Sequence, residues 1–340
     1  MLVKVKGPSP DTPDWSAADR FLMLINDPWY RLLVDLQHQL TIATHAYWAE
    51  RSCKTLHLPI TTHSISSPMG LGSDSLPVEV ELCGVRTFLA DSMQFMLEYG
   101  CRLNAGGAFY LMPSFRGEDA DSTHLCQFYH SEVEIHGGLE DAMVSAEDYI
   151  KAMTREILAN CSEELTLRAN GIAHLEKFVS AAIPRVRFDE AAQILGEKAD
   201  LVVQREGWRN ITRLGERHLM QHFGGPVWVT HWDHLAVPFY QAFDQKEPSK
   251  AMNADLLLGT GEVLGLGERH ATGVEVRAAL ELHQVTQESY RWYIEMKDSF
   301  PLKTAGYGMG VERFLLWVLG HDDIRDLQIL PRFNGQSVVP

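Results

Sequence analysis

The sequence predicts an α/β fold of the α+β kind, in which a single domain is built on a largely antiparallel sheet flanked by helices. Residues 30–50 place leucines at steps of three and four, which is typical of an amphipathic helix. Residues 108–118 and 126–137 read as two strands joined by a polar loop, and residues 306–320 read as a glycine-rich strand that runs into an apolar helix. No repeat or break in composition divides the chain, so we expect one domain.

Weaker patterns predict the elements that lie between these segments. Ser145 and Asp148 match a capping box, which predicts that a helix begins there and continues through residues 149–158. Residues 160–215 read as mixed helical sequence. The other predicted elements are two strands around a turn at Cys83 and Gly84, a short helix over residues 91–100, and buried strands over residues 224–232 and 253–259.

The start of the chain differs in composition from the rest. Residues 1–14 are rich in proline and glycine, as loose segments often are. We therefore assign residues 1–29 to an N-terminal arm and residues 30–340 to the folded domain.

The composition and charge exclude several classes of protein. With 45% apolar and 22% charged residues over 340 positions, the chain is neither disordered nor fibrous. Its 30 Lys and Arg against 45 Asp and Glu give a net charge of −15, which argues against an extended basic surface that binds nucleic acid. It has no apolar run long enough for a membrane span and no signal-peptide pattern. Its five cysteines form no CxxC motif, which favours a reducing cytoplasm.

Two motifs admit a ligand-binding interpretation that we do not favour. Residues 259–270 contain glycines spaced as in a dinucleotide-binding loop, but Glu262 would direct negative charge at the pyrophosphate. The segment HWDH (residues 231–234) suggests metal ligands, and so do His124 and His130, yet neither has the helical spacing and third ligand of a zinc motif. We therefore interpret the histidines of HWDH as hydrogen-bonded or core residues.

The predicted hairpin carries chemically suggestive side chains on one face. If its two strands alternate regularly, every second residue faces the same side of the sheet. An arginine there suits a phosphate, an aromatic ring suits a nucleobase, and carboxylates suit an amine. The residues that this alternation brings together are Arg116, Glu118, Phe128, Glu132 and Glu134.

Two other segments supply groups of the same kind. Arg313 follows glycines, Gly310 among them, at a predicted strand-to-helix junction, where the helix N-terminus favours negative charge. Asp255 and Glu262 lie at a predicted strand end and in the next turn. Because Mg²⁺ prefers one or two carboxylates together with phosphate oxygens, this pair predicts a Mg²⁺ site that faces a triphosphate.

These segments together resemble the three motifs of class II aminoacyl-tRNA synthetases. The helix over residues 30–50 with Pro59 resembles motif 1, the FRGE…HLCQFY hairpin resembles motif 2, and GYGMGVERF resembles motif 3, in the same order. The segments GGPVWVTHW…PFY, NADLLLGTGEVLGLGER and YRWYIEMKDSF are similar to asparaginyl-tRNA synthetases, so the resemblance is to the aspartyl/asparaginyl branch, over residues 30–335. Synthetases of that branch carry an N-terminal anticodon-binding domain, which residues 1–29 are too short to form. In plan the chain is therefore closest to the archaeal asparagine synthetase A.

The resemblance implies an ATP-dependent ligase that requires Mg²⁺, forms an aminoacyl-adenylate and works as a homodimer through motif 1, without binding a tRNA anticodon. Arg269 would read the substrate's side-chain carboxylate or amide, and a bidentate contact suits a carboxylate. By the same resemblance, Arg116 and Arg313 would be catalytic; ATP would be bound by Arg116, Glu118, His124, Phe128, Glu262, Gly310 and Arg313; the substrate by Ser92, Gln94, His130, Glu132, Glu134 and Arg269; and the metal ion by Asp255 and Glu262.

The sequence departs from the family pattern at positions near the substrate. Leu97 stands where aspartyl enzymes and the archaeal asparagine synthetase have a lysine, Gln127 where motif 2 usually has a glutamate, and His130 where a glutamine is frequent. The leading interpretation is adenylation of aspartate or a close analogue, followed by amide formation with ammonia or a small amine. Two alternatives stay open: a ligase for a different amino acid in a specialised-metabolite pathway, and a non-catalytic paralogue that senses an amino acid.

Overall fold

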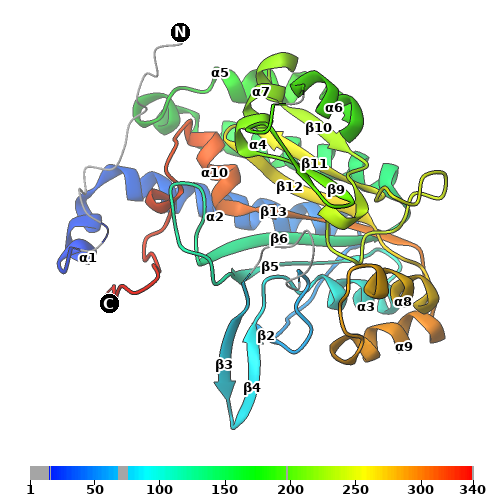
Figure 1. Ribbon diagram of the computed structural model, residues 1–340. Coiled ribbons are helices and arrows are strands. Elements are labelled where there is room, and N and C mark those ends of the chain that lie inside the picture. Colours follow the sequence, from blue (N-terminus) through cyan, green and yellow to red (C-terminus); the bar gives the residue numbers. More distant parts are fainter. Residues whose placement is uncertain (1–14, 16, 68–75, 197, 339–340) are drawn as a thin grey trace.

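A large, mostly antiparallel sheet forms the centre of the protein (Figure 1). The structure is a computed structural model that describes residue 15 and residues 17–67, 76–196 and 198–338. Within these residues the sheet has eight strands, and only the outer pairs β1–β5 and β10–β7 run parallel. The predicted fold class is thus confirmed. The strands, in spatial order, are β1 (Lys54–Thr55), β5 (Ala108–Phe115), β6 (Gln127–His136), β13 (Thr304–Gly310), β12 (Gly261–Glu268), β11 (Asn253–Leu258), β10 (Val227–Thr230) and β7 (Arg185–Arg187).

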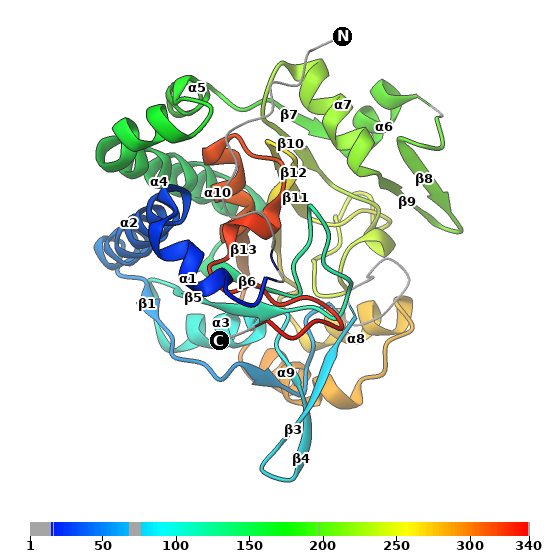
Figure 2. The same ribbon diagram turned by 90° about the vertical axis from the view of Figure 1, so that its left-hand side faces the viewer.

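Alternation along the strands gives the sheet one apolar face and one polar face. On the apolar face, Phe109, Val133 and Tyr307 of three neighbouring strands are buried in the core. Two long helices, α2 (Pro28–Glu50) and α4 (Leu139–Arg168), cover this face and lie side by side (Figure 2). The buried leucines of α2 form the stripe from which the helix was predicted. The polar face is left open for ligands.

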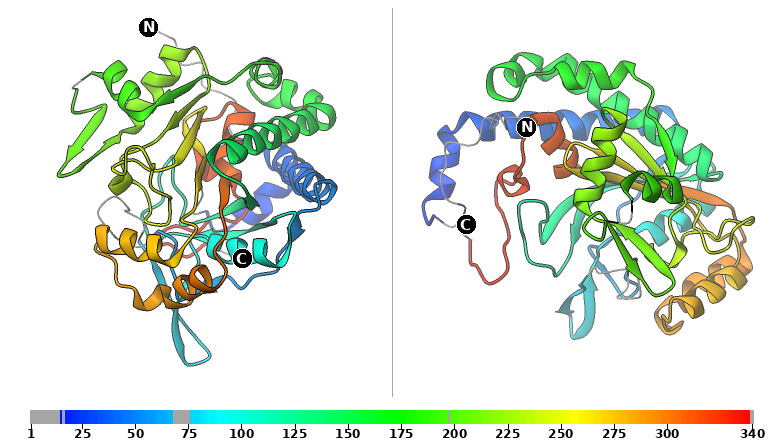
Figure 3. Two further views of the ribbon diagram at one scale, coloured as in Figure 1. Left: turned by 90° about the vertical axis from the view of Figure 1, so that its right-hand side faces the viewer. Right: turned by 45° about the horizontal axis from the view of Figure 1, so that its top comes forward.

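Smaller units surround the sheet. Helices α8 and α9 pack together at one end, away from α6 and α7, and the β3–β4 hairpin projects from the body (Figures 1 and 3). No helix formed by the described residues is long and apolar enough to cross a membrane. The remaining elements are α1 (Arg20–Met23), β2 (Thr61–Thr62), β3 (Val78–Leu82), β4 (Val85–Leu89), α3 (Gln94–Leu103), α5 (Ala173–Ser180), α6 (Phe188–Leu195), β8 (Val202–Arg205), β9 (Trp208–Ile211), α7 (Arg213–Phe223), α8 (Gly273–Leu282), α9 (Arg291–Ser299) and α10 (Val311–Leu319).

The first long helix begins slightly earlier than predicted. Helix α2 begins at Pro28, so Pro28 and Trp29 belong to the helix rather than to the predicted arm. The side chain of Asp27 caps it by accepting a hydrogen bond of 2.9 Å from the backbone N–H of Trp29. Residues 1–14 of the arm lie outside the described residues.

The predicted start of the second long helix, α4, is wrong. Helix α4 begins at Leu139, where Oδ2 of Asp141 accepts a hydrogen bond of 2.8 Å from the backbone N–H of Gly138. Ser145 lies inside the helix, and its Oγ is 3.2 Å from the hydroxyl of Tyr307. The sequence pattern misled because a glycine at the N-cap offers no capping side chain to recognise.

Two other predicted segments also need correction. The stretch read as mixed helical sequence contains, besides helices, the three short strands β7, β8 and β9. The short helix predicted to end at Gly100 is α3 and continues to Leu103. The two strands around Cys83 and Gly84 are present, and both turn residues have the positive φ of a tight hairpin turn, 54° and 78°.

Candidate active site

Glycines form the floor of the polar face. Gly308 of β13 pairs with Glu132 of β6 on one side and with Gly265 of β12 on the other. A Cβ at Gly308 would come within 3.2 Å of Cγ of Glu132, and a Cβ at Gly265 would come within 2.9 Å of Oε1 of Glu262. Any larger residue would therefore displace the carboxylates that rise from neighbouring segments. The glycines leave room for a ligand to approach the backbone of the sheet.

Two adjoining cavities lie above this floor. We name each by an arginine that lines it: the Arg313 cavity, of about 470 Å³, and the Arg269 cavity, of about 330 Å³. Of the residues predicted for the site, only Glu134 lines neither cavity, because it is fully buried. Arg116, Glu118, His124, Phe128, His130, Glu262, Gly310 and Arg313 line the Arg313 cavity, and Ser92, Gln94, Arg116, His130, Glu132, Asp255, Glu262 and Arg269 line the Arg269 cavity.

Glu132 is held in its ionised form in the Arg269 cavity. Ser92 donates a hydrogen bond of 2.6 Å from Oγ to Oε2 of Glu132, and Nδ1 of His130 lies 2.8 Å from Oε1. Burial alone would raise the pKa of Glu132, but the charge of His130 and the hydrogen bonds bring the pKa below its ordinary value. A buried carboxylate that stays ionised suits the ammonium group of an amino acid.

Arg269 is already bound on two sides. Its Nε lies 3.2 Å from both carboxylate oxygens of Glu134, and its Nη2 donates to Oε2 at 3.1 Å. Its Nη1 donates to Oε1 of Gln241 at 3.0 Å, and its Cζ lies 5.2 Å from the ring centre of Tyr240. Burial, only partly opposed by Arg269, raises the pKa of Glu134 to about 7. We expected a bidentate contact between Arg269 and a substrate carboxylate. In this arrangement Glu134 already binds Nε and Nη2 of Arg269, so these two groups are not available to the substrate.

Polar atoms of Arg116 and Glu118 lack partners. Nε of Arg116 is buried, no described residue accepts a hydrogen bond from it, and its Cζ lies 5.7 Å from the ring centre of Phe128. Glu118 accepts a hydrogen bond of 2.9 Å through Oε1 from the backbone N–H of Leu76, while Oε2 is buried without a partner among the described residues. Buried polar atoms in folded proteins are nearly always paired. The open donor and acceptor therefore indicate a ligand that supplies both partners.

Comparison with known proteins identifies the family. The profile described as "tRNA synthetases class II (D, K and N)" matches residues 13–334. The chain belongs to this family. It is 26% identical over 331 residues to the asparagine--tRNA ligase of Koribacter versatilis (strain Ellin345), which covers 94% of this chain and 73% of that protein. It is 30% identical over 324 residues to the asparaginyl-tRNA synthetase of Homo sapiens, which covers 88% of this chain and 66% of that protein.

Solved structures of synthetases share the fold. Asparaginyl-tRNA synthetase from Pyrococcus horikoshii, complexed with asparaginyl-adenylate, has a TM-score of 0.86 at 23% identity and covers 95% of this chain and 73% of that chain. The Entamoeba histolytica enzyme, also in complex with asparaginyl-adenylate, has a TM-score of 0.81 at 20% identity and covers 95% of this chain and 71% of that chain. The resemblance to the catalytic core of the aspartyl/asparaginyl branch is confirmed. Class II synthetases are ATP-dependent ligases that use Mg²⁺.

Asp255 and Glu262 fit the Mg²⁺ ion that the family uses. Both carboxylates approach the space above Gly265: a Cβ there would lie 3.4 Å from Oδ1 of Asp255 and 2.9 Å from Oε1 of Glu262. Burial, and after it the negative charges of Glu262 and Glu216, raise the pKa of Asp255 well above its ordinary value. Repelling carboxylates in one cavity are the oxygen donors that a hard cation takes. The two predicted residues can therefore supply two carboxylates to the ion, and phosphate oxygens of ATP would complete its ligands.

His124 contacts a cation that the sequence did not suggest. Nη2 of Arg213 lies 2.7 Å from Nδ1 of His124, and Nη1 of Arg213 donates to Oγ1 of Thr123. Burial and the charge of Arg213 lower the pKa of His124, so the imidazole is neutral. Arg213 lines the Arg313 cavity and adds a positive charge beside His124, which was predicted to bind ATP.

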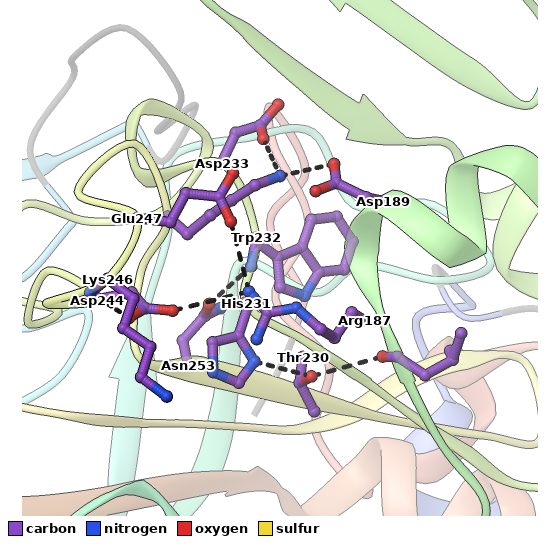
Figure 4. Close-up of polar contacts among 12 residues, drawn as sticks. Arg187, Asp189, Thr230, His231, Trp232, Asp233, Asp244, Lys246, Glu247 and Asn253 are labelled. Atoms are coloured by element: carbon purple, nitrogen blue, oxygen red, sulfur yellow. Dashed lines mark hydrogen bonds and ion pairs between the residues drawn. The ribbon is translucent and has the colours of Figure 1, made fainter.

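The histidines of HWDH make hydrogen bonds within the protein. Nδ1 of His231 lies 2.9 Å from Oγ1 of Thr230 (Figure 4). His234 is buried, with Nδ1 2.9 Å from Nε2 of His283 and Nε2 2.8 Å from the backbone oxygen of Gln241. In the part of the chain that the structure describes, no group of three His, Cys, Asp or Glu side chains is placed to hold a metal ion.

A charged cluster anchors the loop that follows β10. Nζ of Lys250 lies 2.7 Å from the carboxylates of both Asp189 and Asp233. At the start of the loop, the backbone N–H of Trp232 donates to Oδ1 of Asn253 at 3.1 Å. Asn253 lines the Arg269 cavity, as do other residues of this loop. The cluster thus fixes one wall of that cavity.

The sequence analysis missed several residues that line the two cavities. Arg213, Glu216 and Gln241 are three of them. Arg213 and Glu216 belong to an amphipathic helix whose polar residues all look solvent-exposed in sequence. The only available signal for Gln241 was its position directly after the PFY segment that resembles the family.

Proposed function

We propose that the chain joins aspartate, or a close analogue, to ammonia or a small amine through an aspartyl-adenylate, with release of AMP and pyrophosphate. One observation carries the proposal: Arg116 lines both cavities, between groups suited to a nucleotide and groups suited to an amino acid. The side-chain carboxylate of aspartate in one cavity would meet the α-phosphate of ATP in the other at this residue. A guanidinium placed there stabilises the charge that develops on the phosphate oxygens during the attack.

The first step forms the adenylate. An oxygen of the side-chain carboxylate of aspartate forms a bond to the α-phosphorus, while the bond from that phosphorus to the pyrophosphate oxygen breaks. Glu132 binds the α-ammonium group, Phe128 stacks on adenine, and Oε2 of Glu118 accepts from the adenine amino group. The attacking carboxylate is already ionised, so positioning and electrostatic stabilisation suffice without a general base. Mg²⁺ held by Asp255 and Glu262 would neutralise charge on the leaving pyrophosphate.

The second step forms the amide. The nitrogen of ammonia forms a bond to the acyl carbon, the bond from that carbon to the phosphate oxygen of AMP breaks, and the nitrogen releases a proton to solvent. The net charge of −15 supports a small acceptor, because a negatively charged protein binds a polyanion such as a nucleic acid unfavourably.

A second candidate function is the transfer of the amino acid to tRNA. It is favoured by the names of the relatives, an asparagine--tRNA ligase and an asparaginyl-tRNA synthetase, of whose lengths the chain spans 73% and 66%. The ATP site would be the same, but the adenylate would form on the α-carboxylate and the acceptor would be tRNA. Of the other two alternatives, a ligase for a different amino acid would share the ATP site, whereas an amino-acid sensor would not need to bind ATP.

Product analysis separates these functions. The purified protein is incubated with ATP, Mg²⁺ and aspartate, with either ammonium chloride or total tRNA as the acceptor. Equal amounts of AMP and asparagine in the ammonium reaction would support the proposal, whereas ADP would exclude an adenylate mechanism. Aminoacylated tRNA without free asparagine would establish the second candidate, and adenylate formed only with another amino acid would establish the third. Absence of any thermal shift with ATP and Mg²⁺ would point to the sensor.

We also propose that the protein is a cytoplasmic homodimer. The family resemblance implies a dimer through motif 1, which corresponds to α2 and the segment that follows it. All five cysteines are free, which fits a reducing compartment. Light scattering after size-exclusion chromatography should give twice the mass of one chain, and a monomer at micromolar concentration would contradict the dimer.

A further inference from the structure

We propose that His130 is a catalytic residue of the second step, in which its Nε2 accepts the proton that the attacking nitrogen loses when the amide forms. The inference rests on the proposed function and deepens it, because it adds a general base to a site whose first step needs none. It also separates the two steps, since only the second one depends on this histidine.

His130 lies midway between the two groups that would bind opposite ends of the adenylate. Phe128, His130 and Glu132 alternate along β6 and so face the same side of the sheet. Because a strand rises about 3.3 Å per residue, Phe128 and Glu132 lie about 13 Å apart along it. In the proposed complex Phe128 stacks on adenine and Glu132 binds the α-ammonium group. The bond between the acyl carbon and the phosphate oxygen lies between these two ends and therefore above His130.

His130 also lies where the two cavities meet. It lines both of them, as Arg116 does, and its side chain is 15% exposed. The imidazole packs edge-on against Phe128, with 4.8 Å between the ring centres. On the neighbouring strand β13 its pairing partner is Gly310, which has no side chain that could cover the ring. The imidazole is thus open to the reacting atoms that Arg116 would hold.

The hydrogen bonds of the ring assign its two nitrogen atoms. Oε1 of Glu132 lies 2.8 Å from Nδ1, and Oγ of Ser114 lies 2.9 Å from the same nitrogen. The ionised carboxylate of Glu132 can only accept, so Nδ1 carries a hydrogen and donates it. No described residue forms a hydrogen bond with Nε2. In the neutral imidazole Nε2 therefore has a free lone pair, and a carboxylate at the other nitrogen is the arrangement that orients an imidazole as a base.

Binding of the amino acid favours the neutral form of this imidazole. Ser92 and His130 each contact one oxygen of Glu132, and a carboxylate has about four acceptor positions, so the α-ammonium group can bind there as well. An imidazolium would then be a second positive charge beside a single buried carboxylate. Because the two cations repel each other, the imidazole releases its proton to solvent when the substrate binds. The base is thus ready once the amino acid is in place.

The second step balances with His130 as the proton acceptor. The nitrogen of ammonia forms a bond to the acyl carbon, and one of its hydrogens moves as a proton to Nε2. The bond from that carbon to the phosphate oxygen breaks, AMP leaves with the electron pair, and the imidazolium returns the proton to solvent. Removal of the proton keeps the nitrogen from leaving the acyl carbon again.

The experiment measures the two steps separately in His130→Gln, which keeps a polar side chain but has no basic nitrogen. ATP–pyrophosphate exchange with aspartate reports the first step, and formation of asparagine from ammonium chloride reports the second. The control His222→Gln makes the same change at an exposed position of α7, outside both cavities. In His130→Gln asparagine formation should fall about 100- to 10,000-fold, the usual contribution of a general base, whereas exchange should stay within about threefold. His222→Gln should change neither rate.

Hydroxylamine as the acceptor distinguishes proton transfer from positioning. It is a weaker base than ammonia, so its nitrogen loses a proton more readily after the attack and depends less on a catalyst. In His130→Gln the rate of hydroxamate formation should therefore fall much less than the rate of asparagine formation. Equal losses with the two acceptors, or an equal loss of exchange, would make His130 a positioning residue and overturn the inference. An unchanged rate of asparagine formation would overturn it as well.

The outcomes also separate the inference from the proposed function. Absence of exchange by the unmodified protein, or exchange without asparagine formation, would overturn the proposed function, and the inference with it, before any variant is compared. If His130→Gln does not fold, His130→Ala takes its place, with imidazole added to the reaction. Asparagine formation that rises with added imidazole would then support the inference, and asparagine formation that does not rise would overturn it.

Discussion

The carboxylate of Glu312 accepts a hydrogen bond of 2.9 Å from the backbone N–H of Tyr129, which joins the first turn of α10 to β6 beside the Arg313 cavity. This contact fixes the position of Arg313, the next residue, relative to Phe128, the residue before Tyr129. Glu312 is only 3% exposed, and burial raises its pKa to about 7 although the hydrogen bond favours the ionised form. The junction of the two motifs is therefore sensitive to pH.

Glu312→Gln should stabilise the protein at pH 8 and have a much smaller effect at pH 5. The pKa of Glu312 is about 7 in the folded state against 4.5 ordinarily, so the unfolded state loses its proton first and stability falls as the pH rises from about 4.5 to about 7. The amide removes the buried charge, and its oxygen can still accept the hydrogen bond from the backbone N–H of Tyr129. We expect a gain of roughly 1–3 kcal/mol at pH 8 by urea denaturation. Equal effects at both pH values would show that Glu312 does not titrate as described.

Arg116→Ala should abolish most of the adenylation activity and leave the fold intact. Removing one group that stabilises developing charge typically lowers the rate by about 100- to 1000-fold. Because Nε of Arg116 has no partner among the described residues, the substitution removes no protein hydrogen bond at that atom. Pyrophosphate exchange measures the activity and thermal unfolding measures the fold, with Arg205→Ala on an exposed strand as the control. Full activity of Arg116→Ala would show that the phosphate is held elsewhere.

Asp233→Asn should weaken binding of the amino acid more than binding of ATP. Asp233 accepts hydrogen bonds from the backbone N–H of Arg209 at 2.8 Å and from Nζ of Lys250 at 2.7 Å, and it thereby anchors the loop that carries Gln241. That loop contributes to the Arg269 cavity and not to the Arg313 cavity. We expect KM for aspartate to rise about tenfold, as a small displacement of positioning groups does, with KM for ATP nearly unchanged.

Glu247→Gln on the same loop is the matched control for that experiment. Glu247 is half-exposed, and its carboxylate lies 3.6 Å from Nη2 of Arg187, too far for a strong ion pair. The Glu247→Gln substitution should therefore leave the KM values for aspartate and for ATP unchanged. Parallel increases in both KM values for Asp233→Asn would show that the cluster supports the whole domain rather than this wall.

The polar face of the β5–β6 hairpin could be predicted because alternation is a local rule. Phe128 pairs with Ser114 and Glu132 with Tyr110 in an uninterrupted register, so every second residue stays on the cleft face. The short strands β7, β8 and β9 were missed for the opposite reason. Three or four residues are too few to show a period, and β7 (Arg185–Arg187) is a strand because it pairs with β10.

Gln241 and Glu216 could not be predicted because only the tertiary fold gives them a role. Gln241 reaches Arg269 through a contact between segments 28 residues apart in sequence. Glu216 lies on α7, which packs against β12 and brings the carboxylate towards Glu262. Burial, and after it the charge of Glu262, raises the pKa of Glu216 to about 7, which no local pattern indicates. Which residues line a cavity wall depends on how distant segments pack together. Residues of a motif, in contrast, can be recognised from the local sequence alone.

Lys297→Met should destabilise the protein strongly, and more than the double variant Glu98→Gln with Lys297→Met. The side chains of Lys297 and Glu98 form an ion pair with no exposed surface. Glu98 also accepts a hydrogen bond of 2.8 Å from the hydroxyl of Tyr293. Loss of the lysine leaves the carboxylate of Glu98 buried without its counter-charge, which costs about 3–5 kcal/mol. The double variant removes both charges and should cost less, as urea denaturation of the three variants would show. If the single and double variants lost the same stability, Glu98 would be protonated and the pair would carry no charge. Burial raises the pKa of Glu134, and the negative charge of Glu98 adds to this effect. With Glu98 protonated, that added effect would be absent.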